Sequence, residues 1–497
     1  MISTKEGGLW QQELGPWTAA PHQSFVLALG RGSLDQALEK IGRFVSAAQI
    51  RVAAEATTWA AAGKHDRQTL KKFPCYSIGT SFGESAIPYV EWISTWSQLA
   101  EAAEHGNYPR TVWIVLEAYY SAGFLALADR RHQAQLEVRL AALARNFNYY
   151  RSALKPGTRT MVMVKAGGYG TGSFEIARTL EMEDVGHLAV AYVDEGVILR
   201  RQGITVPILV LNVLPSAFPQ LIRYDLEAEI YSLAQLRALQ ATAEEIQPQK
   251  KIQIHLKLET GLNRLGLVKD ELSALVKAIQ EASFLEVYSV FSHLAAADNP
   301  AEREFTLQQW SRFRQMADWL EQQWGFSFLR HLANSSAVEH YPEAHFDMVR
   351  LGIGVYGISS AKDCQDKLDL VARLTTRVAQ VKKLAKGETV SYGRKYVAPK
   401  ATRIAVISMG YADGFPRLLG TGRGKVAIAG RIYAVIGRVC MDLFMIEVGD
   451  DPVQAGDEVE IFGWDLDVAE VARDRDSIPY EVLTSVAERV PRRYWLP

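Results

Sequence analysis

One pattern repeats between about residues 160 and 357: a short apolar run followed by a stretch whose apolar residues recur at helical spacing. Eight of these runs are predicted to be strands: 161–166, 187–193, 207–213, 226–232, 251–259, 285–290, 329–337 and 348–357. Residues 269–282 and 303–323 are the clearest amphipathic helices between them. Strands that alternate with helices form parallel βα units, so eight units predict a closed (β/α)8 barrel. An open doubly wound sheet has the same periodicity, and the pattern alone leaves that alternative open.

After about residue 372 the helical spacing disappears, and turns rich in glycine and aspartate separate short apolar runs. The predicted strands of this region are 374–384, 402–410, 425–430, 432–439, 443–449 and 457–463. Helical spacing returns only at residues 480–490. Many strands with little helix between them predict a separate, mostly antiparallel β domain.

The first 134 residues have a third character. Ser33 can cap a helix, with Gln36 completing a capping box. The apolar face of this helix would consist of Leu34, Ala37, Leu38, Ile41 and Val45. One strand is predicted at residues 111–118, ahead of a helical stretch, so this region is interpreted as a small α/β segment. The sequence thus predicts three domains: 1–134, 135–372 and 373–497.

Charge and cysteine content exclude several classes of protein. The formal net charge of −1 gives the chain no field that would attract nucleic acid or an anionic membrane. The three cysteines, Cys75, Cys364 and Cys440, lack CxxC spacing, which argues against a disulfide framework and against a zinc site. The first residues lack the pattern of a secretory signal, and no apolar run is long enough to span a membrane. A cytoplasmic protein without a metal, nucleic-acid or membrane partner is expected.

Two segments place chemically useful residues at the ends of predicted barrel strands, where barrel enzymes have their active sites. Lys165 follows the first strand, and partial burial there would favour the neutral amine that forms a Schiff base. The glycine-rich segment 352–357 follows the eighth strand, where backbone N–H groups can bind a phosphate, and Arg350 lies just before it. Taken singly, each feature has a more common explanation. The lysine can simply reach solvent, the glycine-rich segment can be an ordinary turn, and the arginine can form a structural ion pair.

Eight motifs, in order, make this part of the chain resemble the alanine racemase family. Segment 164–172, VKAGGYGTG, is similar to the signature by which this family binds pyridoxal 5'-phosphate (PLP), usually VKANAYGHG. The other motifs are LKLETGLNRLG (256–266), SHLAAAD (292–298), HLANSSA (331–337), MVRLGIGVYG (348–357), VSYGRKYVA (390–398), MGYADGFPR (409–417) and GRVCMD (437–442). The resemblance covers about residues 135–497. It implies a PLP-dependent enzyme that interconverts L- and D-alanine as a homodimer with shared active sites, supplying D-alanine for peptidoglycan.

The resemblance also implies roles for single residues. Lys165 would hold PLP and act as one catalytic base, and Tyr392 of the partner subunit would act as the other. The remaining cofactor contacts would come from Tyr169, Ser335, the backbone of Gly352 and Ile353, Arg350 and His293. The substrate would be bound by Arg264 together with Met441 of the partner subunit, Tyr411 of the partner subunit and Asp442 of the partner subunit.

These roles agree with the chemistry of racemisation. A proton must leave one face of the α-carbon and another must reach the opposite face, so two bases suffice. Arg350 stays protonated in practice, so it would keep the pyridine nitrogen of PLP unprotonated and limit side reactions. Lys257 lies seven residues before Arg264 and is often carbamylated in the family. Because an unmodified ammonium would repel Arg264, a carbamate is predicted here, with an ordinary strand lysine as the rival interpretation.

The chain departs from the family pattern at four positions. Gly167 and Gly168 replace the usual Asn-Ala, Thr171 replaces a histidine, and Glu488 replaces a tyrosine that reaches the phosphate. A carboxylate would repel phosphate, so Glu488 is expected to point elsewhere. These changes bear on substrate range and rate more than on the class of reaction.

The stretch 73–138, and its end RRHQAQLEV most of all, resembles the end of the muramoyl-tripeptide–D-alanyl-D-alanine ligase, which some bacteria fuse ahead of the racemase. The nearby pair Gly63-Lys64 lacks the spacing and the hydroxyl residue of a nucleotide-binding loop. Residues 1–134 are therefore interpreted as a non-catalytic remnant of that ligase's last domain, or else as an unrelated regulatory module. For the whole chain, the alternatives are a PLP-dependent decarboxylase, a racemase of another amino acid, and a non-catalytic PLP-binding protein.

Overall fold

The computed structural model describes residues 133–495 and, earlier in the chain, seven strands. These strands are β1 (Ile2–Lys5), β2 (Gly8–Leu9), β3 (Gln23–Ala28), β4 (Ile50–Ala53), β5 (Cys75–Gly79), β6 (Val90–Ile93) and β7 (Trp113–Ala118). They form a mixed sheet in the order β2-β1-β3-β7-β4-β5-β6 within a first compact unit, Met1–Asp129; the second unit is Arg130–Pro497. β7 confirms the strand predicted at 111–118, whereas the helix predicted to begin at Ser33 lies outside the described residues.

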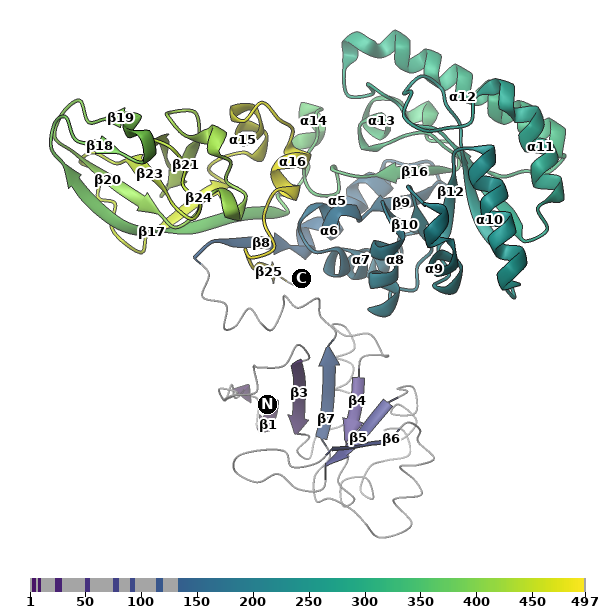
Figure 1. Ribbon diagram of the computed structural model, residues 1–497, viewed down its shortest axis with the longest axis horizontal. Coiled ribbons are helices and arrows are strands. Elements are labelled where there is room, and N and C mark those ends of the chain that lie inside the picture. The colour runs from purple at the N-terminus through teal and green to yellow at the C-terminus, as the bar shows by residue number, and fades with distance from the viewer. Residues whose placement is uncertain are drawn as a thin grey trace. The chain divides into compact units, whose positions relative to one another are not determined.

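Eight parallel strands of the second unit form a closed barrel (Figure 1). They are β9 (Arg159–Met163), β10 (His187–Val190), β11 (Ile208–Val210), β12 (Glu227–Ile230), β13 (Ile252–Lys257), β14 (Leu285–Phe291), β15 (Leu329–His331) and β16 (Met348–Leu351). β16 pairs with β9 and closes the ring. The predicted barrel is therefore confirmed, and the open-sheet alternative is wrong.

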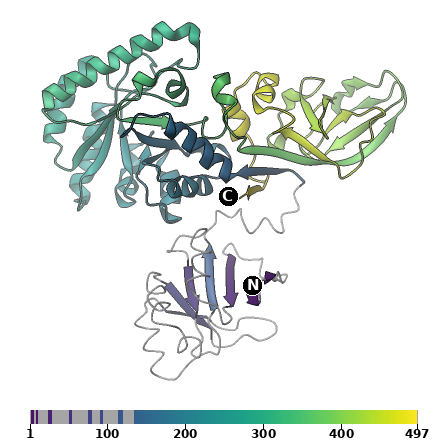
Figure 2. The same cartoon turned by 180° about the vertical axis from the view of Figure 1, so that it is seen from behind.

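Helices cover the outer side of the barrel, as the view from behind shows (Figure 2). They are α5 (Leu140–Ser152), α7 (Ser173–Met182), α8 (Val193–Arg201), α9 (Phe218–Arg223), α10 (Leu233–Ile246), α11 (Leu272–Glu281) and α12 (Arg303–Trp324). In α12 the buried side chains include Phe313, Met316 and Leu320, which recur at helical spacing and face the strands. Because both sides of a strand are covered, every residue of β10, β11 and β16 is buried, and apart from His187 and Arg350 these strands are apolar.

A second sheet, mostly antiparallel, follows the barrel in the chain. Its strands are β17 (Ala372–Leu384), β20 (Thr402–Ile407), β21 (Lys425–Ile428), β22 (Arg431–Ile436), β23 (Phe444–Glu447) and β24 (Glu458–Phe462), with β8 (Gln135–Arg139) and β25 (Arg492–Trp495) along one side. All six strands predicted after residue 372 are confirmed. β8 precedes the barrel in the sequence but pairs with β17 and β25, so this sheet takes one strand from ahead of the barrel (Figure 1).

Short elements complete the second unit. β18 (Thr389–Val390) and β19 (Tyr396–Val397) flank the turn η7 (Tyr392–Arg394). α15 (Val468–Asp474) was not predicted, and α16 (Pro479–Thr484) ends six residues before the end of the helix predicted at 480–490. α6 (Lys165–Tyr169), α13 (Ser335–His340) and α14 (Lys362–Gln365) follow β9, β15 and β16. Within the residues that the structure describes, no helix combines the length and the apolar content needed to cross a membrane.

Candidate active site

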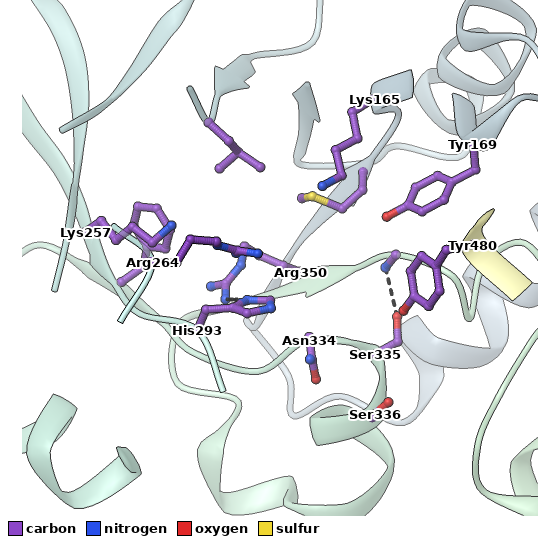
Figure 3. A pocket seen from close by; sticks show the side chains of 14 residues that line it. Lys165, Tyr169, Lys257, Arg264, His293, Asn334, Ser335, Ser336, Arg350 and Tyr480 are labelled. Carbon is purple, nitrogen blue, oxygen red and sulfur yellow. Dashed lines mark hydrogen bonds between the residues drawn. The ribbon is translucent and has the colours of Figure 1, made fainter. Parts of the chain in front are cut away.

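A cavity of about 290 Å³ lies where the carboxyl ends of the barrel strands meet (Figure 3). Eight of the predicted site residues line it: Lys165, Tyr169, Lys257, Arg264, His293, Ser335, Arg350 and Gly352. The other lining residues are Met163, Leu211, Phe291, Asn334, Ser336 and Tyr480. Tyr480 comes from α16, whereas the others end a barrel strand or follow one. The barrel thus brings together residues that lie almost 200 positions apart in the sequence.

A left-handed turn presents Lys165 to the cavity. Residues 166–168 have φ values of +53°, +63° and +62°. Gly167 and Gly168 adopt such angles without the steric cost that a side chain meets, so glycine suits the backbone here. Thr171 is buried, and its hydroxyl donates to the carbonyl of Gly168. These departures from the usual signature therefore stabilise the turn that positions the lysine.

The surroundings of Lys165 favour its neutral amine. Burial lowers the pKa of Lys165 below its ordinary value, the positive charge of Arg264 lowers it further, and Glu195 opposes this shift. The side chain points into the cavity (Figure 3). A neutral amine is the nucleophilic form that bonds to an aldehyde, so this lysine is prepared for that chemistry.

Hydroxyl and amide groups gather on one side of the cavity. Tyr169, Tyr480 and Ser335 lie together there in Figure 3, and the two tyrosine rings have centroids 5.7 Å apart. The Gly352 N–H donates to Oγ of Ser335 at 2.8 Å. Burial raises the pKa of both tyrosines, that of Tyr480 to about 12, so their hydroxyls keep their protons and can donate. This donor set suits a phosphate group.

Arg350 is buried and held by several acceptors. Its Nη1 donates to Nδ1 of His331 at 2.8 Å, and its Nη2 donates to the carbonyls of Ser292 at 2.6 Å and Leu332 at 3.0 Å. Nδ1 of His293 lies 3.3 Å from Nη2. Burial holds the pKa of both histidines well below the usual value, and Arg350 adds to this, so each ring is neutral and can accept. The guanidinium is thus fixed at the cavity wall.

A hydrogen-bond chain that was not predicted extends from Arg350 through the barrel interior. Nε2 of His331 lies 2.8 Å from Oγ of Ser289, which lies 2.6 Å from Nδ1 of His255. Nε2 of His255 contacts Glu227 at 2.8 Å. With the arginine donating to His331, each member can donate to the next, and the chain ends on a carboxylate. Alternate polar residues in the predicted strands were its only signal in the sequence.

Lys257 has a partner that was also not predicted. Its Nζ lies 2.8 Å from Oε1 of Glu229 on β12, and the Glu229 side chain has no exposed surface. Arg264 lines the same cavity. Lys257 therefore has a buried carboxylate beside it, and this anion can balance the charge of an unmodified lysine.

Four predicted residues that a partner subunit would supply lie outside the cavity lining. Tyr392 is 71% exposed, Met441 is 53% exposed and Tyr411 is 41% exposed. Asp442 pairs with Arg489 at 2.7 Å. None of the four contributes to the cavity of its own chain.

Two other expectations concern the cofactor end of the site. Ile353 is buried beside Gly352, and its side chain is not part of the lining. Glu488 is exposed and does not line the cavity. This agrees with the expectation that a carboxylate, which would repel a phosphate, points elsewhere.

The lining residues fit PLP. One side offers hydroxyl and amide donors for a phosphate, and the other offers Arg264, Arg350 and His293 (Figure 3). Lys165 enters between the two sides with its amine directed inward. No carboxylate occurs among the described residues that line the cavity, so nothing there repels an anionic cofactor.

Comparison with known proteins gives the same family for both parts of the second unit. Residues 138–360 match the family described as "Alanine racemase, N-terminal domain", and residues 371–494 match "Alanine racemase, C-terminal domain". The chain is 39% identical to an alanine racemase of Desulfosudis oleivorans over 379 residues, which cover 73% of this chain and 96% of that protein.

Solved structures are similar over the same region. An alanine racemase from Streptomyces coelicolor A3(2) is 31% identical with a TM-score of 0.70, covering 74% of this chain and all of that chain. An alanine racemase from Bartonella henselae with covalently bound pyridoxal phosphate is 27% identical with a TM-score of 0.68, covering 73% of this chain and 99% of that chain.

Proposed function

This chain belongs to the alanine racemase family, and we propose that it interconverts L-alanine and D-alanine with PLP as its cofactor. The observation that supports this most strongly is Lys165, whose pKa is lowered by burial and whose side chain points into a cavity that fits PLP. The test is to load the protein with PLP and measure exchange of the α-hydrogen with deuterium for a panel of L-amino acids. Alanine should exchange fastest, with D-alanine appearing at a comparable rate. Release of CO2 in place of exchange would instead indicate a decarboxylase.

Each residue of the cavity has its own role in the proposed reaction. When bound, PLP supplies an aldehyde for the lysine and an electron sink for the charge left when the α-proton departs. Lys165 removes or returns the proton on one face of the α-carbon. Arg264 binds the substrate carboxylate, which fixes the α-carbon near the Lys165 amine. Tyr169 and Ser335 would donate to the phosphate of bound PLP, and Arg350 would donate to its pyridine nitrogen and keep that nitrogen unprotonated, because arginine holds its own protons.

The second base is proposed to be Tyr392 of the partner subunit in a homodimer. Tyr392 is largely exposed and lies outside the cavity of its own chain, so a second chain is needed to bring such a group to Lys165. Its turn is strained, because Ser391 and Arg394 have φ values of +65° and +51°. Strained non-glycine residues cluster at functional sites, where the surrounding structure holds them in place. Met441 and Tyr411 expose apolar surface that a partner would cover.

The N-terminal unit is proposed to be a remnant of the ligase, without catalysis of its own. The support is the sequence likeness of residues 73–138 and the lack of a nucleotide-binding loop around Gly63-Lys64. We also propose that the protein works in the cytoplasm. Cys364 and Cys440 are free thiols, which suits a reducing compartment.

A further inference from the structure

A buried carboxylate lies behind the cationic wall of the cavity. Glu229 is fully buried on β12, and Lys257 at the end of β13 is 5% exposed. Their ion pair, at 2.8 Å, is the contact made by Oε1 of Glu229. Within the part of the chain that the structure describes, Oε2 of Glu229 has no hydrogen-bond donor. Removing the ammonium would therefore leave an isolated charge in the barrel interior.

The surroundings of Glu229 are strongly positive. Burial raises the pKa of Glu229, whereas Lys257, Arg264 and Arg350 each oppose this rise. In turn, the charge of Glu229 opposes the lowering of the Arg350 pKa by burial. Buried charges are tolerated only when they are paired, so this one anion compensates a group of cations that would otherwise repel each other.

We propose that Glu229 is the built-in anion of this active site, a positioning residue that keeps Lys257 as an unmodified ammonium and offsets the charge of Arg264 and Arg350. This replaces the carbamate predicted from the sequence at Lys257. The inference rests on the proposed function only for the role given to Arg264.

A carbamate would meet two physical obstacles here. It forms when a neutral amine attacks CO2, which creates an N–C bond and releases one proton. The carboxylate of Glu229 stabilises the ammonium, which is the form of Lys257 that cannot attack. The product would also place a second anion about one hydrogen-bond length from the carboxylate in a buried site, where like charges repel strongly.

The direct test is carbon-13 NMR of the PLP-loaded protein equilibrated with carbon-13 bicarbonate. A Lys257→Ala variant identifies any carbamate signal that belongs to this lysine. The wild-type protein should give no signal that the variant loses. A carbamate signal from Lys257 in the wild type would overturn the proposal, whether or not the protein racemises alanine.

A Glu229→Gln variant should reverse the result. Without the anion, no carboxylate at position 229 pairs with the Lys257 ammonium or repels a carbamate there, so a carbamate signal should appear that is absent from a Glu229→Gln, Lys257→Ala double variant. Glu227→Gln is the matched control, since Glu227 lies two residues away on the same strand but contacts His255. It should give no carbamate signal. Equal signals from Glu229→Gln and Glu227→Gln would contradict the assignment.

Chemical rescue provides a second readout. In Lys257→Ala the missing charge is positive under this proposal and negative if the lysine were carbamylated. Small amines such as methylamine should therefore restore the substrate KM, and acetate should not. Rescue by acetate alone would overturn the proposal.

Discussion

Nη1 of Arg350 and Nδ1 of His331 lie 2.8 Å apart in the barrel interior, and this contact joins the cavity wall to the hydrogen-bond chain that ends at Glu227. His331 can accept from the arginine only while it is neutral and protonated at Nε2. Ser289, by accepting at that nitrogen, selects this tautomer. The orientation of Arg350 therefore depends on groups that do not touch the cavity.

Replacing Ser289 with Ala tests this dependence. The change leaves His255 and His331 without a shared partner in a buried site, so the free energy of unfolding should fall by about 1–3 kcal/mol. Urea denaturation measures it, with the exposed Ser283→Ala as the control. The proportion of transamination to racemisation should also rise, because Arg350 is held less firmly. If Ser289→Ala matched Ser283→Ala in both measurements, the hydrogen-bond chain from Arg350 to Glu227 would have no positioning role.

Stability should fall as the pH drops from about 6.5 towards 4. Burial lowers the pKa of His187 from its usual value to about 4, so in this range the unfolded chain binds a proton that the folded chain does not. By linkage, the free energy of unfolding then rises with pH, by at most about 3 kcal/mol from this residue. Urea denaturation between pH 4.5 and 7 should show a shallower dependence in His187→Gln. Identical slopes in the two proteins would contradict the buried, neutral histidine.

The turn after Lys165 predicts different outcomes for two substitutions at one position. Gly167 has a φ of +63° and no atom within 4 Å of the place where a Cβ would lie. Asparagine adopts this conformation readily, so Gly167→Asn should change the free energy of unfolding by less than about 0.5 kcal/mol. Valine does not, and Gly167→Val should lose about 1–2 kcal/mol together with PLP occupancy, measured by visible absorbance. Equal effects would mean that the backbone angle is unimportant.

A chain of residues 130–497 should keep racemase turnover. It retains β8, whose pairing with β17 and β25 needs Leu136 and Val138, both fully buried. The full chain should neither bind ATP nor ligate D-alanyl-D-alanine. Turnover and oligomeric state of the shortened chain are the measurements. A PLP-loaded dimer without activity would show that the N-terminal unit contributes to catalysis or regulation.

Much of the fold could be predicted because several barrel strands are buried on both faces and appear in the sequence as short, largely apolar runs. Their ends were harder to predict. The run at 329–337 contains only the strand Leu329–His331, because Asn334 caps the helix α13 and accepts from the Ala337 N–H. β8 was not predicted as part of the second sheet because its partner strands lie more than 230 residues away. Such pairing leaves no local signal.

Within the site, the motif residues were predictable and their buried partners were not. Glu229 and Lys257 lie on neighbouring strands. The register pairs Glu229 with His255, and Lys257, two residues after His255, points to the same side of the barrel wall as Glu229. Alternation along one strand cannot give that register. Tyr480 was missed because a tyrosine early in a short helix gives no sign of facing a cavity formed by the barrel.

Each active site is proposed to combine two proton-transfer groups, Lys165 of one chain and Tyr392 of the other. Lys165→Ala should be inactive and lack the visible absorbance of bound PLP. Tyr392→Phe should lose about 10²–10⁴-fold in kcat while keeping its absorbance, because it removes a base and no cofactor contact.

The decisive measurement is the turnover of a mixture of these two inactive variants. In a mixed dimer, one of the two sites has the lysine of one chain and the tyrosine of the other intact, so random exchange should restore about a quarter of wild-type turnover. Subunit exchange is verified with two differently tagged chains. Recovery near this level is expected if Lys165 and Tyr392 of different chains share a site, and no recovery after verified subunit exchange would rule out that arrangement.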